Sequence, residues 1–201
     1  WTLFDCEGGP PVGGLEVSSS SGQYDLCGFP KAAAFWYRTQ WLLSIADGPD
    51  KTFPTHGKHE VHLVESWESP QAFPKTKNQT TRAIHAYSSA PHVELLVNGK
   101  SQGTKDIVPM VQGPGSYAEW KEVPWEAGTI TAVATDAAGK RVATAERHTN
   151  GKKAALHLSI DAPNPATGTG SKLILDGHDA ALLRCALDAA PAPGARAATR
   201  R

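Results

Sequence analysis

The sequence predicts a mainly β fold whose central part, residues 47–150, is an immunoglobulin-like β-sandwich. Two observations lead to this prediction. Short runs of apolar and β-branched residues follow one another between turn clusters, at a spacing typical of a sandwich. The dipeptide Asn98-Gly99 joins two of these runs, and Asn-Gly is the strongest short signal for a β-hairpin. The segment also has the usual size of such a module, about 100 residues.

Turn clusters delimit the expected strands of this sandwich. A second hairpin turn is expected at Asp136–Gly139, where Asp and Gly supply the side-chain acceptor and the positive φ that turns use. The expected strands are His59–Glu65, Arg82–Ser88, His92–Val97, Lys100–Thr104, Gly128–Thr135 and Arg141–Arg147.

Residues 1–46 have a different pattern, a short buried strand at Gly22–Leu26 and then a helix. Pro30 suits the first helical position, and Lys31–Ile45 contains no Gly or Pro. One face of this helix should be packed and the other, with Lys31 and Arg38, exposed. The expected packed residues are Phe35, Trp36, Leu42 and Leu43. Because one βα unit cannot cover both faces of a sheet, this part indicates the end of a larger α/β domain.

The C-terminal part is expected to begin a further module. A strand at Ala155–Asp161 leads through a Pro/Gly/Thr loop into Lys172–Leu187, and residues 151–188 are too few for an independent core. Residues 189–201 lack apolar periodicity and are expected to be a disordered tail. The chain opens on Trp1, without an initiator Met or a signal peptide, so we expect a piece of a longer protein.

Charge and hydropathy exclude several classes of partner. Twenty Lys and Arg balance twenty Asp and Glu, and the sequence lacks the basic field that nucleic-acid binding requires. Apolar stretches fall far short of the roughly 20 residues that a membrane helix needs. Three widely spaced cysteines support neither a disulfide framework nor a metal knuckle, and small buried or half-buried thiols are the expected state.

Motifs for metal, phosphate and serine chemistry are not supported. His59 and His62 lie in a strand-like run and would point to opposite faces, so they cannot share a metal ion. Gly168–Lys172 resembles a phosphate loop, but the order of Gly, Lys and Ser is wrong. No Gly-x-Ser-x-Gly nucleophile elbow is present. We therefore predict no metal site and no cofactor.

Carboxylates and an indole in the first 25 residues invite a comparison with glycoside hydrolysis, which uses two facing carboxyl groups. The candidates are Asp5, Glu7, Glu16 and Asp25. Solvation or capping is the common role of such loop carboxylates. Trp1 suits stacking on the C–H face of a sugar, although a core position is equally compatible with its type.

Two long motifs resemble the end of the catalytic barrel in glycoside hydrolase family 2, and the bacterial-type β-galactosidases most of all. The first is Trp1-Thr2-Leu3-Phe4-Asp5. The second runs from Gly22-Gln23-Tyr24-Asp25-Leu26-Cys27-Gly28-Phe29-Pro30-Lys31 into the aromatic Phe35–Trp41. Downstream, Val93–Ser101 and Val123–Thr129 are similar to the β-sandwich that follows the barrel in these enzymes. The resemblance covers about 185 of the 201 residues.

The resemblance implies a fold, an activity and a site. Residues 1–46 would be the last βα unit of a TIM barrel, 47–150 a sandwich and 151–188 the start of a second one. The activity implied is that of a retaining β-glycosidase. Trp1 would lie in the wall of the sugar subsite at the C-terminal ends of the barrel strands. The two catalytic glutamates are expected upstream of Trp1, in the rest of the catalytic barrel, so no catalytic residue is assigned within this chain.

Departures from the family pattern bear on the substrate. The related β-glucuronidases carry an Asn-x-Lys that suits a sugar carboxylate, and this chain has Ser19-Ser20-Ser21-Gly22 there. A neutral β-glycoside, a galactoside first, is therefore the expected partner. Cys6 replaces an aromatic residue that is usual in the galactosidase-like members.

Two alternatives to an enzyme part stay open at this point. A non-catalytic β-sandwich module could bind carbohydrate on an indole platform or stabilise a partner. The platform would use Trp67, Trp120 and Trp125, although core positions are the more common use of such residues. The Ala/Pro/Arg-rich tail is also compatible with a truncated gene product that has no activity.

Overall fold

The computed structural model describes residues 3–6, 20–46, 48–52, 54, 56–73, 75, 79–108, 116–160 and 183–191. Trp1–Thr149 and Asn150–Arg201 are separate compact units. The described helices include none with the length and apolar character needed to cross a membrane.

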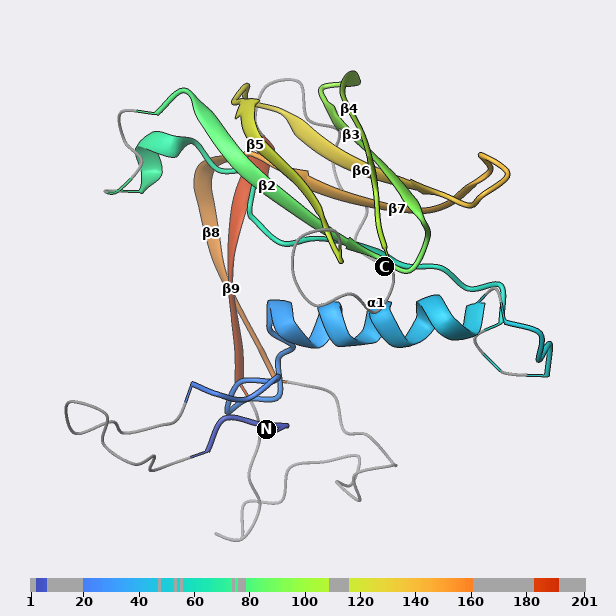
Figure 1. The fold of residues 1–201 in the computed structure, drawn as a ribbon. Coiled ribbons are helices and arrows are strands. Elements are labelled where there is room, and N and C mark those ends of the chain that lie inside the picture. Colours follow the sequence, from blue (N-terminus) through green and yellow to red (C-terminus); the bar gives the residue numbers. More distant parts are fainter. Residues whose placement is uncertain are drawn as a thin grey trace, which may run out of the picture. The chain divides into compact units, whose positions relative to one another are not determined.

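The first unit contains two antiparallel sheets (Figure 1). One sheet has the order β1-β2-β5, and the other has the order β4-β3-β6-β7. The first sheet consists of β1 (Val61–Leu63), β2 (Thr81–Ser88) and β5 (Ala118–Pro124). The second consists of β3 (His92–Val97), β4 (Lys100–Asp106), β6 (Thr129–Thr135) and β7 (Arg141–His148). A short 3-10 helix, Pro70–Ala72, lies between β1 and β2 in the sequence. The predicted β-sandwich is thus confirmed.

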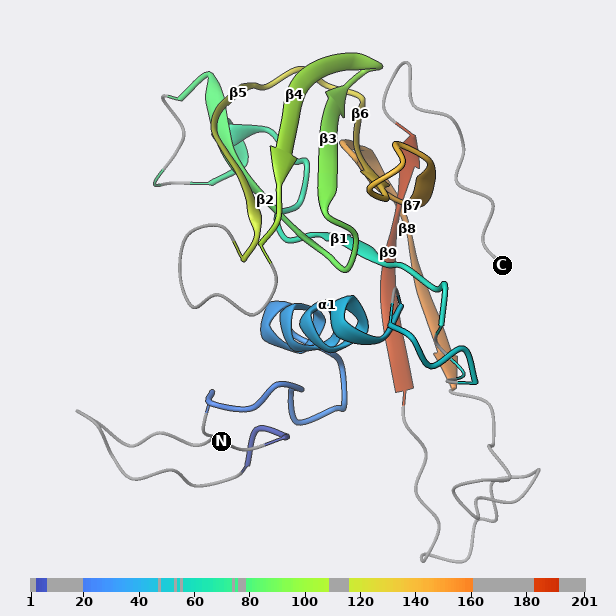
Figure 2. The ribbon, with the colours of Figure 1, turned by 45° about the vertical axis from the view of Figure 1, so that its right-hand side comes forward.

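The core lies between the two sheets, which face each other in Figure 2. Residues alternate between buried and half-buried along β3 and β6, as expected of strands with one face inward. The buried core side chains include Leu63, Ile84, Val93, Leu95, Val97, Trp120, Val123 and Ile130. These residues come from strands of both sheets, so burial of their apolar surface holds the sheets together.

Both predicted hairpin turns are present. Asn98 and Gly99 have φ values of 49° and 81° between Val97 and Lys100, which pair across β3 and β4. Positive φ at both central residues matches the twist of the strands, and Asn and Gly tolerate it best. In the turn between β6 and β7, the Asp136 carboxylate accepts hydrogen bonds from the N–H groups of Ala138 and Lys140.

Strand β5 is absent from the sequence prediction. Its pairing with β2 contains a register irregularity between Arg82 and Ile84. Trp120 and Val123 are both buried although they are three positions apart, so the period of two is broken. Lys121 and Glu122, which lie between them, are charged and exposed, so they further interrupt the apolar alternation by which a strand is recognised in a sequence.

The three tryptophans of the sandwich belong to its core or contact it. Trp67 is 0% exposed and Trp120 is 6% exposed, while Trp125 is partly buried against the core cluster. The Trp67 indole N–H donates to the Glu126 carbonyl, and that of Trp120 donates to the Gly103 carbonyl. The alternative of a sugar-stacking platform is therefore wrong at Trp67 and Trp120, whose indole rings are buried in the core.

The described residues of the N-terminal part form a helix, α1 (Ala32–Ala46), but no regular strand. Tyr24 makes two isolated bridges, parallel to Phe4 and antiparallel to Pro30. The predicted strand Gly22–Leu26 is thus reduced to one position, and Leu26 is 53% exposed. The helix begins at Ala32, two residues after Pro30, which bridges back to Tyr24.

Helix α1 packs on the outer face of the β1-β2-β5 sheet (Figure 1). The Phe35 ring stacks on the His62 ring at 3.7 Å between centroids, and the Gln40 amide donates to the Ser116 carbonyl. Leu42 is buried and Arg38 is exposed, as expected. Buried Thr39 and Gln40 were not predicted, because polar type alone suggests exposure.

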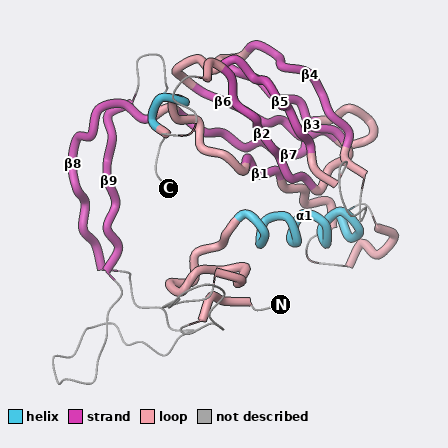
Figure 3. The backbone as a smooth tube through the Cα atoms, turned by 60° about the vertical axis from the view of Figure 1, so that its left-hand side comes forward, coloured by secondary structure: helices cyan, strands magenta, loops and turns pink. Residues whose placement is uncertain are grey.

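The second unit contains two described strands, β8 (Asn150–Ile160) and β9 (Leu183–Pro191). They pair antiparallel from Asn150↔Pro191 to Ile160↔Leu183 and lie side by side in Figure 3. β9 extends three residues into the range assigned to a disordered tail. The end of β9 pairs with the beginning of β8, at Lys153↔Ala189 and Asn150↔Pro191, so the strand continues past Asp188. The assignment of 151–188 to a further module stays a prediction.

Replacement of Trp67 by Ala should lower the free energy of unfolding of the chain by about 3–5 kcal/mol, because it leaves a cavity between the sheets. Urea denaturation followed by far-UV circular dichroism measures this change. Trp41→Ala is the matched control, since Trp41 is 62% exposed and its loss should cost less than about 0.5 kcal/mol. Equal effects of the two substitutions would contradict the core assignment.

His62 should make the stability of the first unit depend on pH. Burial and the nearby Arg147 charge lower the pKa of His62 from 6.5 to about 4. Between these values the unfolded chain binds a proton that the folded chain does not, so stability falls as the pH drops from about 6.5 to about 4. Because the ring is only half-buried, we expect a loss of about 1–2 kcal/mol.

His62→Phe keeps the stacking on Phe35 and should flatten this part of the pH profile of stability. Chemical denaturation at pH 7, 6, 5 and 4.5 measures the profile. A variant that loses as much stability as the unmodified chain over this window would exclude His62 as the cause.

Candidate functional site

The structure brings together part of the predicted site. Asp5, Ser20, Ser21 and Asp25 are described, and all lie in or beside one loop network before α1. Trp1, the predicted sugar-stacking residue, lies outside the described residues, as do the candidate carboxylates Glu7 and Glu16. The prediction for Trp1 therefore stays a prediction.

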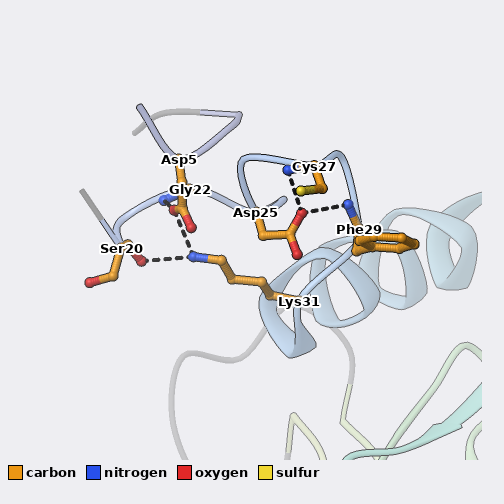
Figure 4. A network of polar contacts seen from close by, with 7 residues as sticks. All are labelled: Asp5, Ser20, Gly22, Asp25, Cys27, Phe29 and Lys31. Carbon is orange, nitrogen blue, oxygen red and sulfur yellow. Dashed lines mark hydrogen bonds and ion pairs between the residues drawn. The ribbon is translucent and has the colours of Figure 1, made fainter. Parts of the chain in front are cut away.

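The Asp5 carboxylate is the centre of this network (Figure 4). Its Oδ1 atom lies 2.7 Å from the Lys31 ammonium and accepts a hydrogen bond of 2.8 Å from the Gly22 N–H. The Lys31 ammonium also donates to the Ser20 carbonyl at 2.9 Å. The Asp5 side chain is 12% exposed and that of Lys31 is 30% exposed. Three segments thus meet at one ion pair.

Gly22 allows the first two of these segments to touch. A Cβ atom at position 22 would lie 2.2 Å from the Asp5 nitrogen and 2.3 Å from the Phe4 carbonyl carbon. The backbones are also joined by hydrogen bonds from Asp5 N–H to the Tyr24 carbonyl and from Tyr24 N–H to the Leu3 carbonyl. Only glycine lets the two backbones come this close, which explains why position 22 of the second motif is a Gly.

Asp25 organises the turn that follows. Its Oδ1 atom accepts hydrogen bonds from the N–H groups of Cys27 and Phe29 at 2.9 and 2.8 Å (Figure 4). Gly28 supplies a φ of 82° in this turn. Asp side chains commonly stabilise turns in this way. Asp25 therefore has the capping role expected of a loop carboxylate.

Neither described carboxylate is arranged as a catalytic acid. The Lys31 hydrogen bond, together with that from Gly22, lowers the pKa of Asp5 below its usual 3.8. A carboxylate with a lowered pKa stays ionised at neutral pH and cannot donate a proton. The geometry instead assigns Asp5 to holding the segments in place.

Lys31 was not predicted to be a site residue. Its partner Asp5 is 26 positions away, and no local pattern links the two. Two signals could have found it: Lys31 is the last residue of the second motif, and it is the first Lys, Arg or His of the chain, after four acidic residues. The first cation after several acidic residues is a fair candidate for an ion pair.

The structure corrects the expectation for the thiols and adds detail on the histidines. Cys6, Cys27 and Cys185 are exposed rather than buried, and none of the three forms a disulfide. Cys27 lies in the turn that the Asp25 carboxylate stabilises. His62 packs between Phe35 and Tyr87. Within the described ranges, no three His, Cys, Asp or Glu side chains gather as a metal site would require.

Gly22→Ala should loosen the two segments, because the added methyl group cannot fit beside the Asp5 and Phe4 backbone. We expect hydrogen exchange at the Asp5 and Tyr24 amides to become at least about tenfold faster, as the hydrogen bonds between the segments weaken. Amide exchange measured by NMR tests this.

Ser20→Ala is the control for this substitution, because Ser20 contributes its backbone carbonyl to the described network. Its amide exchange should match that of the unmodified chain. Unchanged exchange in the Gly22→Ala chain would show that the close approach is not required.

The chain is similar in sequence to a family model and to two curated proteins. Residues 79–143 match a domain of unknown function, DUF4982. The β-galactosidase BoGH2A of Bacteroides ovatus is 34% identical over 164 residues, which are 80% of this chain and 16% of that protein. A Formosa agariphila protein named for β-glucuronidase activity is 32% identical over 136 residues, 66% of this chain and 11% of that protein.

The fold has solved counterparts as well. The structure of a β-glucuronidase from glycoside hydrolase family 2 superposes with a TM-score of 0.63 at 24% identity, over 87% of this chain and 15% of that one. The chain thus spans between a tenth and a sixth of the length of the curated relatives it matches. The two curated relatives show that the chain belongs to glycoside hydrolase family 2, and the solved structure shows that the fold is shared.

Proposed function

We propose that this chain is part of a retaining β-glycosidase that hydrolyses neutral β-glycosides, with β-galactosides as the first candidates. The family relationship supports glycoside hydrolysis, and the identity to a β-galactosidase supports the sugar. The single observation that carries the preference for a neutral sugar is the state of Lys31, whose ammonium is paired with Asp5.

Charge in the N-terminal segment disfavours a uronic acid. Residues 1–30 contain four acidic residues and no Lys, Arg or His. Lys31 follows them, and its ammonium already contacts the Asp5 carboxylate and the Ser20 carbonyl. A sugar carboxylate bound here would meet negative charge without a cation free to pair with it, which costs binding energy. A hydroxyl group at the same place has no such cost.

The two catalytic glutamates of this proposal belong to other parts of the protein. Asp5 and Asp25 are both engaged, the first by Lys31 and the second by turn N–H groups. A retaining glycosidase needs two carboxyl groups about 5 Å apart across the scissile bond. We therefore assign no catalytic role to any residue of this chain. Trp1 keeps its proposed place in the wall of the sugar subsite.

The rest of the catalytic barrel is the proposed partner of α1. A groove of about 560 Å³ lies along the side of α1 that carries Tyr37 and Trp41, and Leu3 and Tyr24 form its other side. Leu3 and Trp41 are 58% and 62% exposed. The Gln23 Oε1 atom beside them is buried and accepts no hydrogen bond. An exposed apolar surface next to a buried acceptor without a hydrogen-bond partner suits contact with another protein segment that supplies a donor.

The full-length protein that contains this chain should hydrolyse p-nitrophenyl β-D-galactopyranoside and release the β-anomer first. A retaining mechanism inverts the anomeric centre twice, so the first-formed anomer reports on it directly. Proton NMR during early turnover measures this outcome, with the α-galactoside as the control that should not react.

The 201-residue chain by itself should give no turnover in the same assay, because neither proposed catalytic glutamate belongs to it. Release of the α-anomer first would contradict the retaining mechanism. Turnover by the isolated chain would contradict the assignment of catalysis to other parts of the protein.

A further inference from the structure

We propose that the cleft between strands β4 and β5 of the sandwich is a binding site for a neutral oligosaccharide. The cleft has a volume of about 420 Å³, within the range of about 300–1,000 Å³ that small-molecule sites have. Each of the two strands that form its walls is the edge strand of its own sheet (Figure 2). This inference goes beyond the proposed function, which assigns no ligand to the sandwich.

Strand β4 is polar on the face that a sandwich normally makes apolar. Residues that lie directly opposite each other in paired antiparallel strands share one face of the sheet. Lys105 is opposite Val93 and Lys100 is opposite Val97, and both valines are buried in the core. The strand Lys100–Asp106 nevertheless contains no aliphatic or aromatic residue. A strand that breaks the pattern of its own sheet in this way is a candidate for a functional role.

Trp120 forms the floor of the cleft and joins its two walls. Its ring belongs to the hydrophobic core, and its indole N–H donates a hydrogen bond of 3.2 Å to the Gly103 carbonyl. Gly103 lies in β4, with a φ of 94°, and Trp120 lies in β5. This bond therefore ties β5 to β4 across the gap between the sheets, so the walls of the cleft are positioned before a ligand arrives.

The side chains of the cleft combine hydrogen-bond donors and acceptors without net charge. Two lysines, Lys105 and Lys121, and two glutamates, Glu119 and Glu122, line it together with Gln102. Lys105, Lys121 and Glu122 have no ion pair and no side-chain hydrogen bond to any other residue that the structure describes. Two ammonium donors and a carboxylate acceptor are thus available to a ligand in one small space.

A neutral oligosaccharide matches this lining better than a charged ligand or a peptide. Each sugar hydroxyl both donates and accepts, so one hydroxyl can contact an ammonium and a carboxylate at once. A charged ligand would meet two like charges in the cleft as well as two opposite ones. Addition of a peptide strand to β4 is disfavoured by its lysines and by the irregular β3–β4 register, which are common protections of sheet edges.

The 201-residue chain, labelled with nitrogen-15, should bind β-linked galactotetraose or cellotetraose saturably. The amide signals of residues 102–105 and 119–122 should shift with one common dissociation constant, because both walls contact the same ligand. Absence of saturable shifts at these amides up to about 20 mM of either tetrasaccharide would overturn the proposal. The experiment measures no hydrolysis, so its result is independent of whether the proposed function holds.

Lys105→Ala and Lys121→Ala should each raise the dissociation constant about tenfold, because each removes a charged donor to a sugar hydroxyl. Lys140→Ala is the matched control, since Lys140 is an exposed lysine in the turn between β6 and β7 and does not line the cleft. Its dissociation constant should stay within about twofold of that of the unmodified chain. Equal weakening in all three variants would show that binding follows the net charge of the chain, and would overturn the assignment to the cleft.

Two further probes test the class of ligand. Tetragalacturonate carries a carboxylate on each ring and should bind the unmodified chain more weakly than the neutral tetrasaccharides, because Glu119 and Glu122 repel it. A short peptide rich in Val and Thr is the probe for strand addition and should cause no saturable shift. Tighter binding of either probe than of both neutral tetrasaccharides would overturn the assignment to a neutral sugar.

Discussion

The ion pair between Asp5 and Lys31 is the interaction on which the N-terminal part of the chain depends. One carboxylate oxygen receives the Lys31 ammonium and the Gly22 N–H, and the same ammonium holds the Ser20 carbonyl. These contacts fasten the Leu3–Cys6 segment, the Ser20–Tyr24 segment and the start of α1 to one another. The geometry of any sugar subsite formed by the first two segments is therefore set before a substrate arrives, which is what precise binding requires.

The β-sandwich gives this network a rigid support. Helix α1 begins at Ala32, directly after Lys31, and it packs on the β1-β2-β5 sheet through Phe35 and Gln40. The sheet is held in turn by a core that contains Trp67 and Trp120. The tryptophans that could have served as a binding platform thus stabilise the scaffold. The sandwich is consistent with a structural contribution to a glycosidase of family 2.

Local signals made most of the sandwich predictable, and long-range contacts made the rest unpredictable. Asn98-Gly99 and Asp136–Gly139 specify their turns by backbone chemistry alone, so the hairpins followed from the sequence. Strand β5 did not, because a register irregularity places Trp120 and Val123 on the same side. In the site, the motif residues were recognisable by resemblance, but the role of Lys31 depends on a partner 26 positions away. Contacts between residues far apart in the sequence produce no periodic pattern from which they could be predicted.

The most direct test of this account is a crystal structure of the full-length protein with a bound galactose-type inhibitor. We predict that the sugar ring lies between Trp1 and the Ser20–Gly22 segment. The Lys31 ammonium should remain paired with the Asp5 carboxylate and should not contact the sugar. A sugar hydroxyl bound directly by Lys31, with Asp5 turned away from it, would contradict the account. So would a sugar bound at a distance from both segments.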